Sequence, residues 1–356
     1  HSHAMEIWKY ISAHDNGVTN FHFEISADLL NEEEIELLTA MRPGLVQLEI
    51  GVQTTNERTI KEVRRTMDTE KLFCAVRALR DAGNIHQHLD LIAGLPYEDL
   101  ASFSRSFDAV CRLRPHQLQL GFLKVLKGSY MEEKKEDYGL ACKSAPPYEV
   151  LFTRWLSYKD ILKLKGIEEM VEIYYNSLQF THTLSVLGQI FASPFSMYEK
   201  LWAYYREKGL AGIHQKRSAR YELLLDFIRD TVDVKDGRGQ SGAHKDTGKF
   251  EETGQFRNLE GFRELLIYDY YLRENAKTRP AFAGENPLEK EKARQFYEEE
   301  EKSHMYLPGY ETYDKNQMRK MTHLEYFPVL GKTVLFDYLH RDPLSHEART
   351  CELQKL

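Results

Sequence analysis

The first part of the chain alternates between two hydrophobic periodicities. Short apolar runs at residues 20–25, 45–51, 88–92 and 117–123 predict β-strands. Segments with the 3.6-residue spacing of helices separate these runs. Such an alternation predicts an α/β fold with a parallel sheet and right-handed crossovers, either open or barrel-like.

Capping residues mark the ends of the predicted helices. Asn31, with Glu34 three positions later, has the pattern of a capping box. Asn56 and Thr69 are expected to cap two further helices, and Gly83 suits the left-handed position that ends the second of these. A fourth helix is expected between the third and fourth strands.

The second part of the chain is mainly helical by the same criteria. The predicted helices cover residues 148–164, 167–187, 194–208, 218–231 and 262–275. The charged run 289–302 predicts a solvated helix, and residues 323–326 and 333–338 predict a small C-terminal hairpin. Residues 233–254 are rich in Gly, Asp, Lys and Ser, which predicts a mobile surface loop.

Tyrosine content divides the chain more sharply than charge does. Residues 1–130 contain only Tyr10, Tyr97 and Tyr130 of the 21 tyrosines. We therefore predict a βα domain at residues 6–128 and a helical, tyrosine-rich domain at residues 131–356. The chain does not begin with methionine, and residues 1–5 are typical of a vector remnant. Pairs such as Tyr174-Tyr175 are expected to leave some rings exposed.

Composition excludes several classes of protein. Hydrophobic residues make up 42% and charged residues 29%, as in globular proteins with a sizeable core. The net charge of −7 argues against a nucleic-acid partner. No apolar run is long enough for a membrane span and no signal peptide is evident, so we predict a cytoplasmic protein without a membrane partner. The four cysteines are scattered, which excludes a disulfide scaffold and local zinc or iron–sulfur spacings.

Polar side chains stand near the carboxyl ends of three predicted strands. They are Glu24, Glu49 with Gln53, and Asp90. Ligands of parallel βα folds bind at this edge, and strand alternation lets Glu24 and Asp90 point into one cavity. Helix caps or salt bridges are the alternative interpretation of each acid.

Three motifs in order resemble the radical S-adenosylmethionine (SAM) superfamily over about residues 5–127. They are Phe23-Glu24-Ile25, Leu48-Glu49-Ile50-Gly51-Val52-Gln53 and Asp90-Leu91-Ile92-Ala93-Gly94-Leu95-Pro96. The resemblance is closest to the subgroup of oxygen-independent coproporphyrinogen oxidase and the cobalamin-binding radical enzymes. It implies a partial (β/α) barrel followed by the helical domain.

The resemblance implies a role for four residues in binding the cofactor. Glu24 corresponds to an acid at the amino-acid part of SAM, whereas Gln53 and Asp90 correspond to residues directed at the ribose. Arg65 corresponds to an arginine near the methionine carboxylate, a group that a planar guanidinium suits. Arg64 is equally placed in the sequence. No residue is assigned a catalytic role.

The cysteine triplet that holds the family's [4Fe–4S] cluster has no counterpart in these 356 residues. We therefore expect a C-terminal piece of a longer enzyme whose intact form uses SAM and a [4Fe–4S] cluster, with a cobalamin-binding domain upstream. This chain alone is expected to bind none of these cofactors and to be inactive. The substrate and the reaction outcome cannot be read from the sequence.

Other hypotheses stay open at this point. A natural cluster-free βα module for binding or assembly is the main alternative, and a ligand-binding protein with a coincidental motif match is another. His86 and His88 have the spacing of a metal pair on a strand but lack an evident third ligand, so no metal ligand is assigned. An exposed sheet edge predicts either a homodimer or cover by the second domain.

Overall fold

The computed structural model describes residues 2–232 and 258–353, which pack as two compact units. Unit 1 comprises His1–Ser177 and Ala192–Ala211, and unit 2 comprises Leu178–Phe191 and Gly212–Leu356. Unit 1 therefore continues past residues 128–131, where the sequence predicted a boundary. The division of the chain into two domains at that boundary stays a prediction. The predicted mobile loop, residues 233–254, lies outside the described residues.

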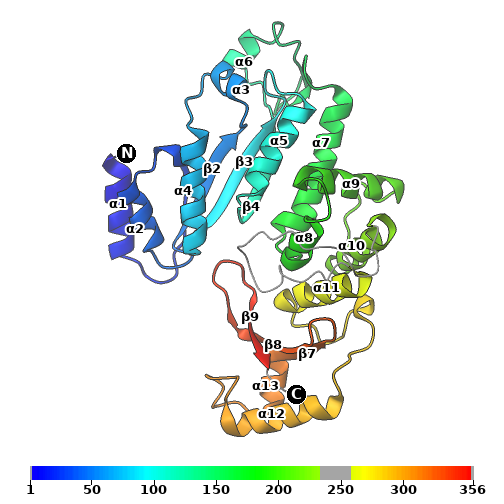
Figure 1. Cartoon of the computed structure of the whole chain (residues 1–356). Helices are drawn as coiled ribbons and strands as arrows, with labels where there is room; N and C mark the ends of the chain where they lie inside the picture. The colour runs from blue at the N-terminus through cyan, green and yellow to red at the C-terminus, as the bar shows by residue number, and fades with distance from the viewer. Residues whose placement is uncertain (1, 233–257, 354–356) are drawn as a thin grey trace. The chain divides into compact units, whose positions relative to one another are not determined.

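Unit 1 contains a four-stranded parallel sheet in the order β1-β2-β3-β4 (Figure 1). The strands are β1 (Phe21–Ile25), β2 (Val46–Gln53), β3 (His86–Ala93) and β4 (Gln117–Phe122). All four predicted strands are confirmed, although β3 begins two residues before its predicted start. The predicted α/β class is confirmed as well.

Helices connect these strands and end close to the predicted signals. They are α1 (Ser2–Ala13), η1 (Ala27–Leu29), α2 (Glu32–Thr39), α3 (Glu57–Glu62), α4 (Thr69–Ala82) and α5 (Leu100–Cys111). The capping box of Asn31 and Glu34 is present, and Asn56 caps α3. The predicted cap at Thr69 is wrong, because Asp68 accepts the hydrogen bond from the Lys71 backbone N–H at 3.1 Å.

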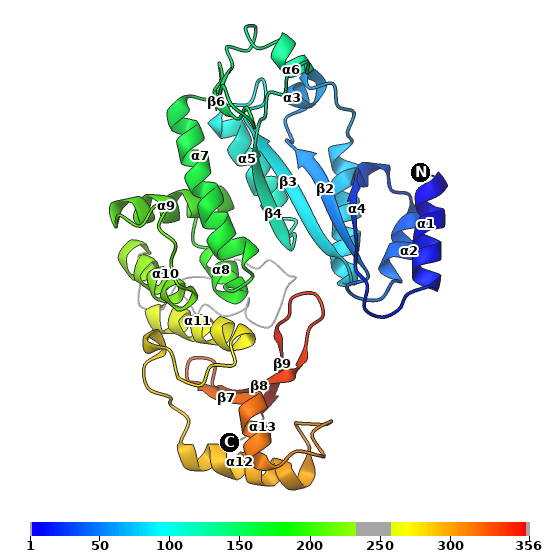
Figure 2. The ribbon, with the colours of Figure 1, turned by 180° about the vertical axis from the view of Figure 1, so that it is seen from behind.

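The sheet has two unlike faces because side chains alternate along each strand. Leu48, Ile50, Leu89 and Leu91 point to the face on which α4 and α5 lie (Figure 1), and all four are completely buried. Figure 2 shows the sheet from the opposite side. There the alternate positions of the strands are mainly polar, which is unusual because parallel sheets are normally apolar on both faces.

The rest of unit 1 combines short strands and longer helices. These elements are α6 (Tyr130–Glu133), β5 (Ala141–Cys142), β6 (Val150–Phe152), α7 (Tyr158–Met170), the π-helical η2 (Val171–Asn176) and α9 (Pro194–Glu207). The predicted helix at 148–164 is wrong in its first part, because the Val150 N–H donates to the Leu123 carbonyl at 2.8 Å as a strand. The predicted break before residue 167 is wrong too. Gly166 lies inside α7, and a Cβ there would lie 2.0 Å from the Trp202 ring, so the glycine serves close packing and does not end the helix.

The edge strand β4 is partly covered by η2. The Asn176 side chain accepts from the Leu118 N–H at 2.9 Å and donates to the Leu118 carbonyl at 3.0 Å. An amide thus replaces a neighbouring strand at this point, which limits pairing with another chain. The predicted homodimer stays a prediction.

Unit 2 is helical with a small antiparallel sheet. Its elements are α8 (Thr181–Leu187), α10 (Arg217–Thr231), α11 (Leu259–Arg273), η4 (Ala281–Ala283), α12 (Lys290–Ser303), α13 (Lys315–Met321), β7 (Thr322–Phe327), β8 (Lys332–Arg341) and β9 (Ala348–Leu353). The predicted hairpin is confirmed as β7-β8, but β9 extends it to three strands. The helix predicted at 289–302 is not simply solvated, because Phe296 and Tyr297 are buried.

The adjacent tyrosines are more buried than expected. Tyr204 and Tyr205 on α9 are 5% and 0% exposed, because this helix packs against both α5 and α7. The hydroxyls of Tyr174 and Tyr205 lie 2.7 Å apart, and the Tyr175 hydroxyl donates to the Pro115 carbonyl at 2.5 Å. The expectation that some of these rings must be exposed is therefore wrong for Tyr204 and Tyr205, whereas Tyr175 is half-buried beside the buried Tyr174.

The length and apolar character of the helices in the described part of the chain bear on membrane crossing. None of them is both long enough and apolar enough to cross a bilayer.

Candidate functional site

The polar face of the sheet gathers the candidate residues of the first region. Register places Glu24 opposite Glu49 and Gly51 opposite Asp90, so neighbouring strands present these side chains side by side. Gln53 ends β2 with a φ of 68°, at a bulge in the pairing with β3. The left-handed conformation of a non-glycine residue here is strained and marks the strand end as a functional candidate.

Arg65 reaches back from the end of α3 to the end of β2. Its guanidinium donates to the Gly51 carbonyl at 2.5 Å. A Cβ on Gly51 would lie 2.7 Å from the Gln53 amide nitrogen and 3.6 Å from the Arg65 guanidinium, so glycine leaves room for both side chains. Arg64 instead lies over the Tyr130 ring, 3.8 Å from its centre. The structure thus places Arg65, and not Arg64, beside Gln53.

Asp90 lies next to this group on β3. Burial, together with the neighbouring Glu49 and Glu24 carboxylates, raises the pKa of Asp90 to about 7, although Arg65 acts to lower it. These interactions show that Glu24, Arg65 and Asp90 share one electrostatic environment. A perturbed acid at the carboxyl end of a parallel strand is a typical feature of a binding or catalytic site.

Histidines occupy the same face one step further from the strand ends. His22 Nε2 lies 3.0 Å from Glu49 Oε2, and His88 Nε2 lies 3.2 Å from Asp90 Oδ1. Burial lowers the pKa of His86 to about 4 and also lowers the pKa of His88. The contacts of Glu49 with His22 and His88 were not predicted from the sequence. The alternating His-x-Glu and His-x-His-x-Asp patterns nevertheless indicate that such polar side chains share one face of the sheet.

Glu98 is a second residue whose role near the site was not predicted from the sequence. It is fully buried behind the strand ends, and its Oε1 accepts hydrogen bonds from Thr54 at 2.6 Å and Ser106 at 3.3 Å. Burial raises its pKa to about 7. Because Thr54 follows Gln53 directly, Glu98 helps to position the loop that carries Gln53.

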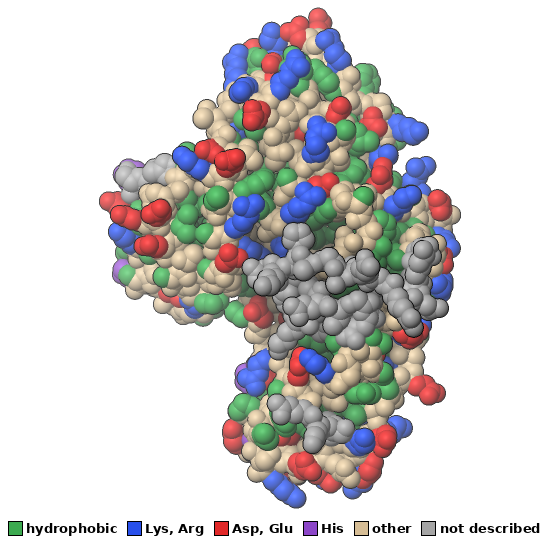
Figure 3. All heavy atoms as spheres, viewed as in Figure 1, with side chains coloured by type: hydrophobic (Ala, Val, Ile, Leu, Met, Phe, Trp, Pro, Cys, Tyr) green, Lys and Arg blue, Asp and Glu red, His purple; other side chains and the backbone are tan. Residues whose placement is uncertain are grey.

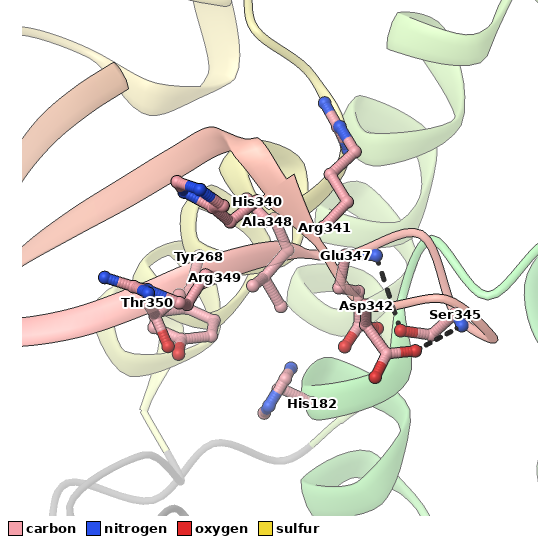
Figure 4. Close-up of a pocket in the computed structure, with 11 residues that line it drawn as sticks. His182, Tyr268, His340, Arg341, Asp342, Ser345, Glu347, Ala348, Arg349 and Thr350 are labelled. Carbon is pink, nitrogen blue, oxygen red and sulfur yellow. Dashed lines mark hydrogen bonds between the residues drawn. The ribbon is translucent and has the colours of Figure 1, made fainter. Parts of the chain in front are cut away.

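Unit 2 contains a polar cavity of its own, of ≈ 460 Å³ (Figure 4). Its lining includes His182, Tyr268, His340, Arg341 and Glu347. The His182 ring is held by the buried Asp269, whose Oδ1 lies 2.8 Å from His182 Nδ1. Such a pairing fixes the orientation of the imidazole.

A larger cavity of unit 2, of ≈ 1250 Å³, is lined by apolar, polar and charged residues, and its charged side chains are mainly basic. They are Lys277, Arg279, Lys290, Arg319 and Lys320, with Glu285 as an acid among them. The Arg279 guanidinium is held by the buried Glu325 carboxylate at 2.6 and 2.7 Å. Elsewhere on the side shown in Figure 3, acidic and basic side chains are interspersed.

The cysteines do not form a cluster site in the described part of the chain. Cys74 lies on α4, Cys111 on α5, Cys142 on β5 and Cys351 on β9, and none of the four forms a disulfide. The one group of three or more metal-ligand side chains found among the described residues contains no cysteine. A [4Fe–4S] cluster needs cysteine thiolates close together, so the residues present do not fit one.

The matches to known proteins fall in two parts of the chain, which correspond to its two sequence regions. The family model described as Radical SAM superfamily matches residues 1–110. Oxygen-independent coproporphyrinogen III oxidase of Salmonella typhimurium (strain LT2) is 33% identical over 107 residues, and the Escherichia coli (strain K12) enzyme is 31% identical over 107. Each match covers 28% of this chain and 23% of the relative, so the chain spans about a quarter of these relatives.

A solved structure also aligns with part of the chain. Coproporphyrinogen III oxidase from Escherichia coli aligns with a TM-score of 0.30 and 24% identity, over 35% of this chain and 29% of that one. The first region is therefore a radical SAM domain, as the motifs predicted.

The second region has its own family model, described as Protein of unknown function (DUF4080), which matches residues 136–337. This match covers more than half of the chain. The chain belongs to this family, and its first region belongs to the radical SAM superfamily.

Proposed function

We propose that the first region forms the nucleoside- and carboxylate-binding part of a SAM site in a radical SAM enzyme. The observation that carries the proposal is the meeting of Gln53, Arg65 and Asp90 at the carboxyl ends of β2 and β3. SAM supplies the deoxyadenosyl group that this superfamily uses as a radical. Asp90 and Gln53 suit ribose hydroxyls, and Arg65 suits the methionine carboxylate.

These side chains fit the cofactor in charge and in space. Gly51 has no Cβ, which leaves space at this edge for the Gln53 amide, and the Asp90 carboxyl group is largely buried beside it. Glu24, at the end of β1, adds an acceptor for the amino group of the methionine part. The role of these residues is to bind and orient the cofactor, and they hold no iron.

We further propose that the cluster ligands lie outside these 356 residues and that this chain by itself is inactive. The support is the position of the four cysteines on four separate elements. Anaerobic reconstitution of the chain with iron and sulfide should then give no [4Fe–4S] absorbance, and stoichiometric cluster uptake would contradict this. The cobalamin-binding domain upstream, the substrate and the cytoplasmic location stay predictions.

The decisive experiment uses the reading frame around residue 1. The upstream sequence should encode a Cys-x3-Cys-x2-Cys motif, and the reconstituted longer protein should release 5′-deoxyadenosine from SAM. Gln53→Ala and Asp90→Asn should reduce this release at least tenfold, whereas Arg64→Ala, next to Arg65, should leave it unchanged. A stop codon directly upstream would favour the cluster-free binding module instead.

A further inference from the structure

Three side chains of metal-ligand type converge on the polar face of the sheet. Glu49 of β2, together with His88 and Asp90 of β3, offers nitrogen and oxygen atoms within 4.8 Å of one another. Alternation along β3 places His88 and Asp90 on the same face, and register places Glu49 directly opposite His88. The sequence suggested only a histidine pair, because parallel register was needed to supply the carboxylates.

The spacing within this group fits a bound ion. His88 Nε2 and Asp90 Oδ1 lie 3.2 Å apart. Two ligands of a tetrahedral zinc ion, with bonds of about 2.1 Å, lie about 3.3 Å apart. Glu49 Oε2 lies 3.9 Å from His88 Nδ1, and rotation of this flexible side chain can bring the carboxylate to the ion.

The two atoms that face each other are buried, and the contact between them is an ion pair. Neither His88 Nε2 nor Asp90 Oδ1 has a hydrogen-bond partner among residues 2–232 and 258–353. The His88 side chain is only 9% exposed. Buried polar atoms normally have a hydrogen-bond partner. A group that accepts electron pairs from both the imidazole nitrogen and the carboxylate oxygen would fill that role here. A divalent cation is such a group.

Charge points to the same kind of ligand. Glu24, Glu49 and Asp90 bring three carboxylates to this face, whereas Arg65 is turned to the Gly51 carbonyl. His22, 3.0 Å from Glu49 Oε2, can hold that carboxylate in place as partners of metal-bound carboxylates commonly do.

We propose that Glu49, His88 and Asp90 bind a divalent transition-metal ion of the zinc type. One imidazole and two carboxylates are a donor set for such ions, and three protein ligands leave a position for water or a substrate oxygen. The proposal goes beyond the SAM site and does not depend on it. Asp90 Oδ2 remains available for the cofactor ribose.

Cobalt titration of the full chain tests the proposal. His1→Ser and His3→Ser are introduced first, so that the N-terminal histidines cannot bind the probe. Co²⁺ should bind with one equivalent and give visible d–d absorption, and Zn²⁺ should displace it. No thiolate-to-cobalt charge transfer should appear, because no cysteine belongs to the site. The titration is carried out without SAM, so its outcome is independent of the proposed cofactor function.

Variants identify the ligands. His88→Gln, Asp90→Asn and Glu49→Gln should each weaken Co²⁺ binding at least about tenfold. His14→Gln, at an exposed histidine next to α1, is the matched control and should bind like the parent chain. Circular dichroism establishes that each variant folds. If His88→Gln does not fold, the binding result for the nearly isosteric Asp90→Asn decides the test. Absence of saturable one-equivalent binding, or unchanged affinity in folded Asp90→Asn and Glu49→Gln, overturns the proposal.

Discussion

The two faces of the four-stranded sheet are built from the same strands but serve different ends. On β2 and β3, Leu48, Ile50, Leu89 and Leu91 are completely buried beneath helices. Their direct neighbours Glu49 and Asp90 point the other way and interact with one another and with histidines. One face therefore stabilises the unit through apolar burial, and the other holds charges whose mutual repulsion and desolvation favour binding of a partner.

The largest expected effect comes from the apolar face. Leu89→Ala, at the centre of the sheet, should lower the free energy of unfolding of unit 1 by about 3 kcal/mol, because it leaves a cavity that helices cannot fill. Urea unfolding followed by tryptophan fluorescence measures this, since Trp8, Trp155 and Trp202 all belong to unit 1. A loss below about 1 kcal/mol would contradict the assignment of this face as the core.

Glu98 should make stability depend on pH in a defined direction. Its pKa is about 7 in the folded chain and near 4.5 when unfolded, so the folded state binds more protons between these values. Stability should therefore fall by up to about 3 kcal/mol as pH rises from 4.5 to 7. Glu98→Gln should remove this part of the slope, while retaining an oxygen that accepts from Thr54.

The difference between Glu98→Gln and the parent chain is the quantity to measure. His86 contributes with the opposite sign, because its pKa near 4 makes stability fall as pH drops from about 6.5. Subtraction of the two urea-unfolding curves cancels this contribution. The exposed Glu33→Gln on α2 is the control, and parallel curves for Glu98→Gln and the parent would contradict the burial effect.

Gly94 joins β3 to the loop behind the site and should be less tolerant than an ordinary turn glycine. Its φ is +95°, and a Cβ there would lie 2.8 Å from the Val150 side chain. Gly94→Ala should cost about 2 kcal/mol through strain and overlap. Gly17→Ala, with a φ of +77° and open space around it, should cost about 1 kcal/mol. Equal losses in thermal unfolding would show that Val150 does not restrict the site.

The smallest effect is expected at Gln119, an exposed residue of the polar face that pairs with Asp90 in the register. Gln119→Ala on β4 removes an exposed side chain and should change stability by less than about 0.5 kcal/mol. The contrast with Leu89→Ala, measured by the same urea unfolding, expresses the comparison of the two faces as one number. A loss as large as that of Leu89→Ala would show that both faces are core.

Local signals in the sequence predicted most of the elements of the first region. The capping box at Asn31, the cap at Asn56 and the left-handed Gly83 act within a few residues, and the structure contains all three. Prediction failed where a distant partner decides. Val150 is a strand residue that pairs with Cys142 and donates to the Leu123 carbonyl, and Gly166 lies within α7 where only a glycine leaves space for the Trp202 ring.

The candidate site shows the same division. The sequence motifs alone singled out Glu24, Gln53, Arg65 and Asp90, but they could not separate Arg65 from Arg64. That choice depends on where the turn after α3 aims each guanidinium, which the positive φ of Arg64 and the approach to Gly51 settle.

The sequence by itself determined which face of each strand is apolar, because side-chain direction follows from alternation alone. Only the tertiary structure decided which polar residues become neighbours, because that depends on the register between strands whose paired residues are 38 or 39 positions apart, as for Glu49 and His88 or Gly51 and Asp90. Those pairings bring carboxylates and imidazoles into one place, and the chemistry of this face depends on them.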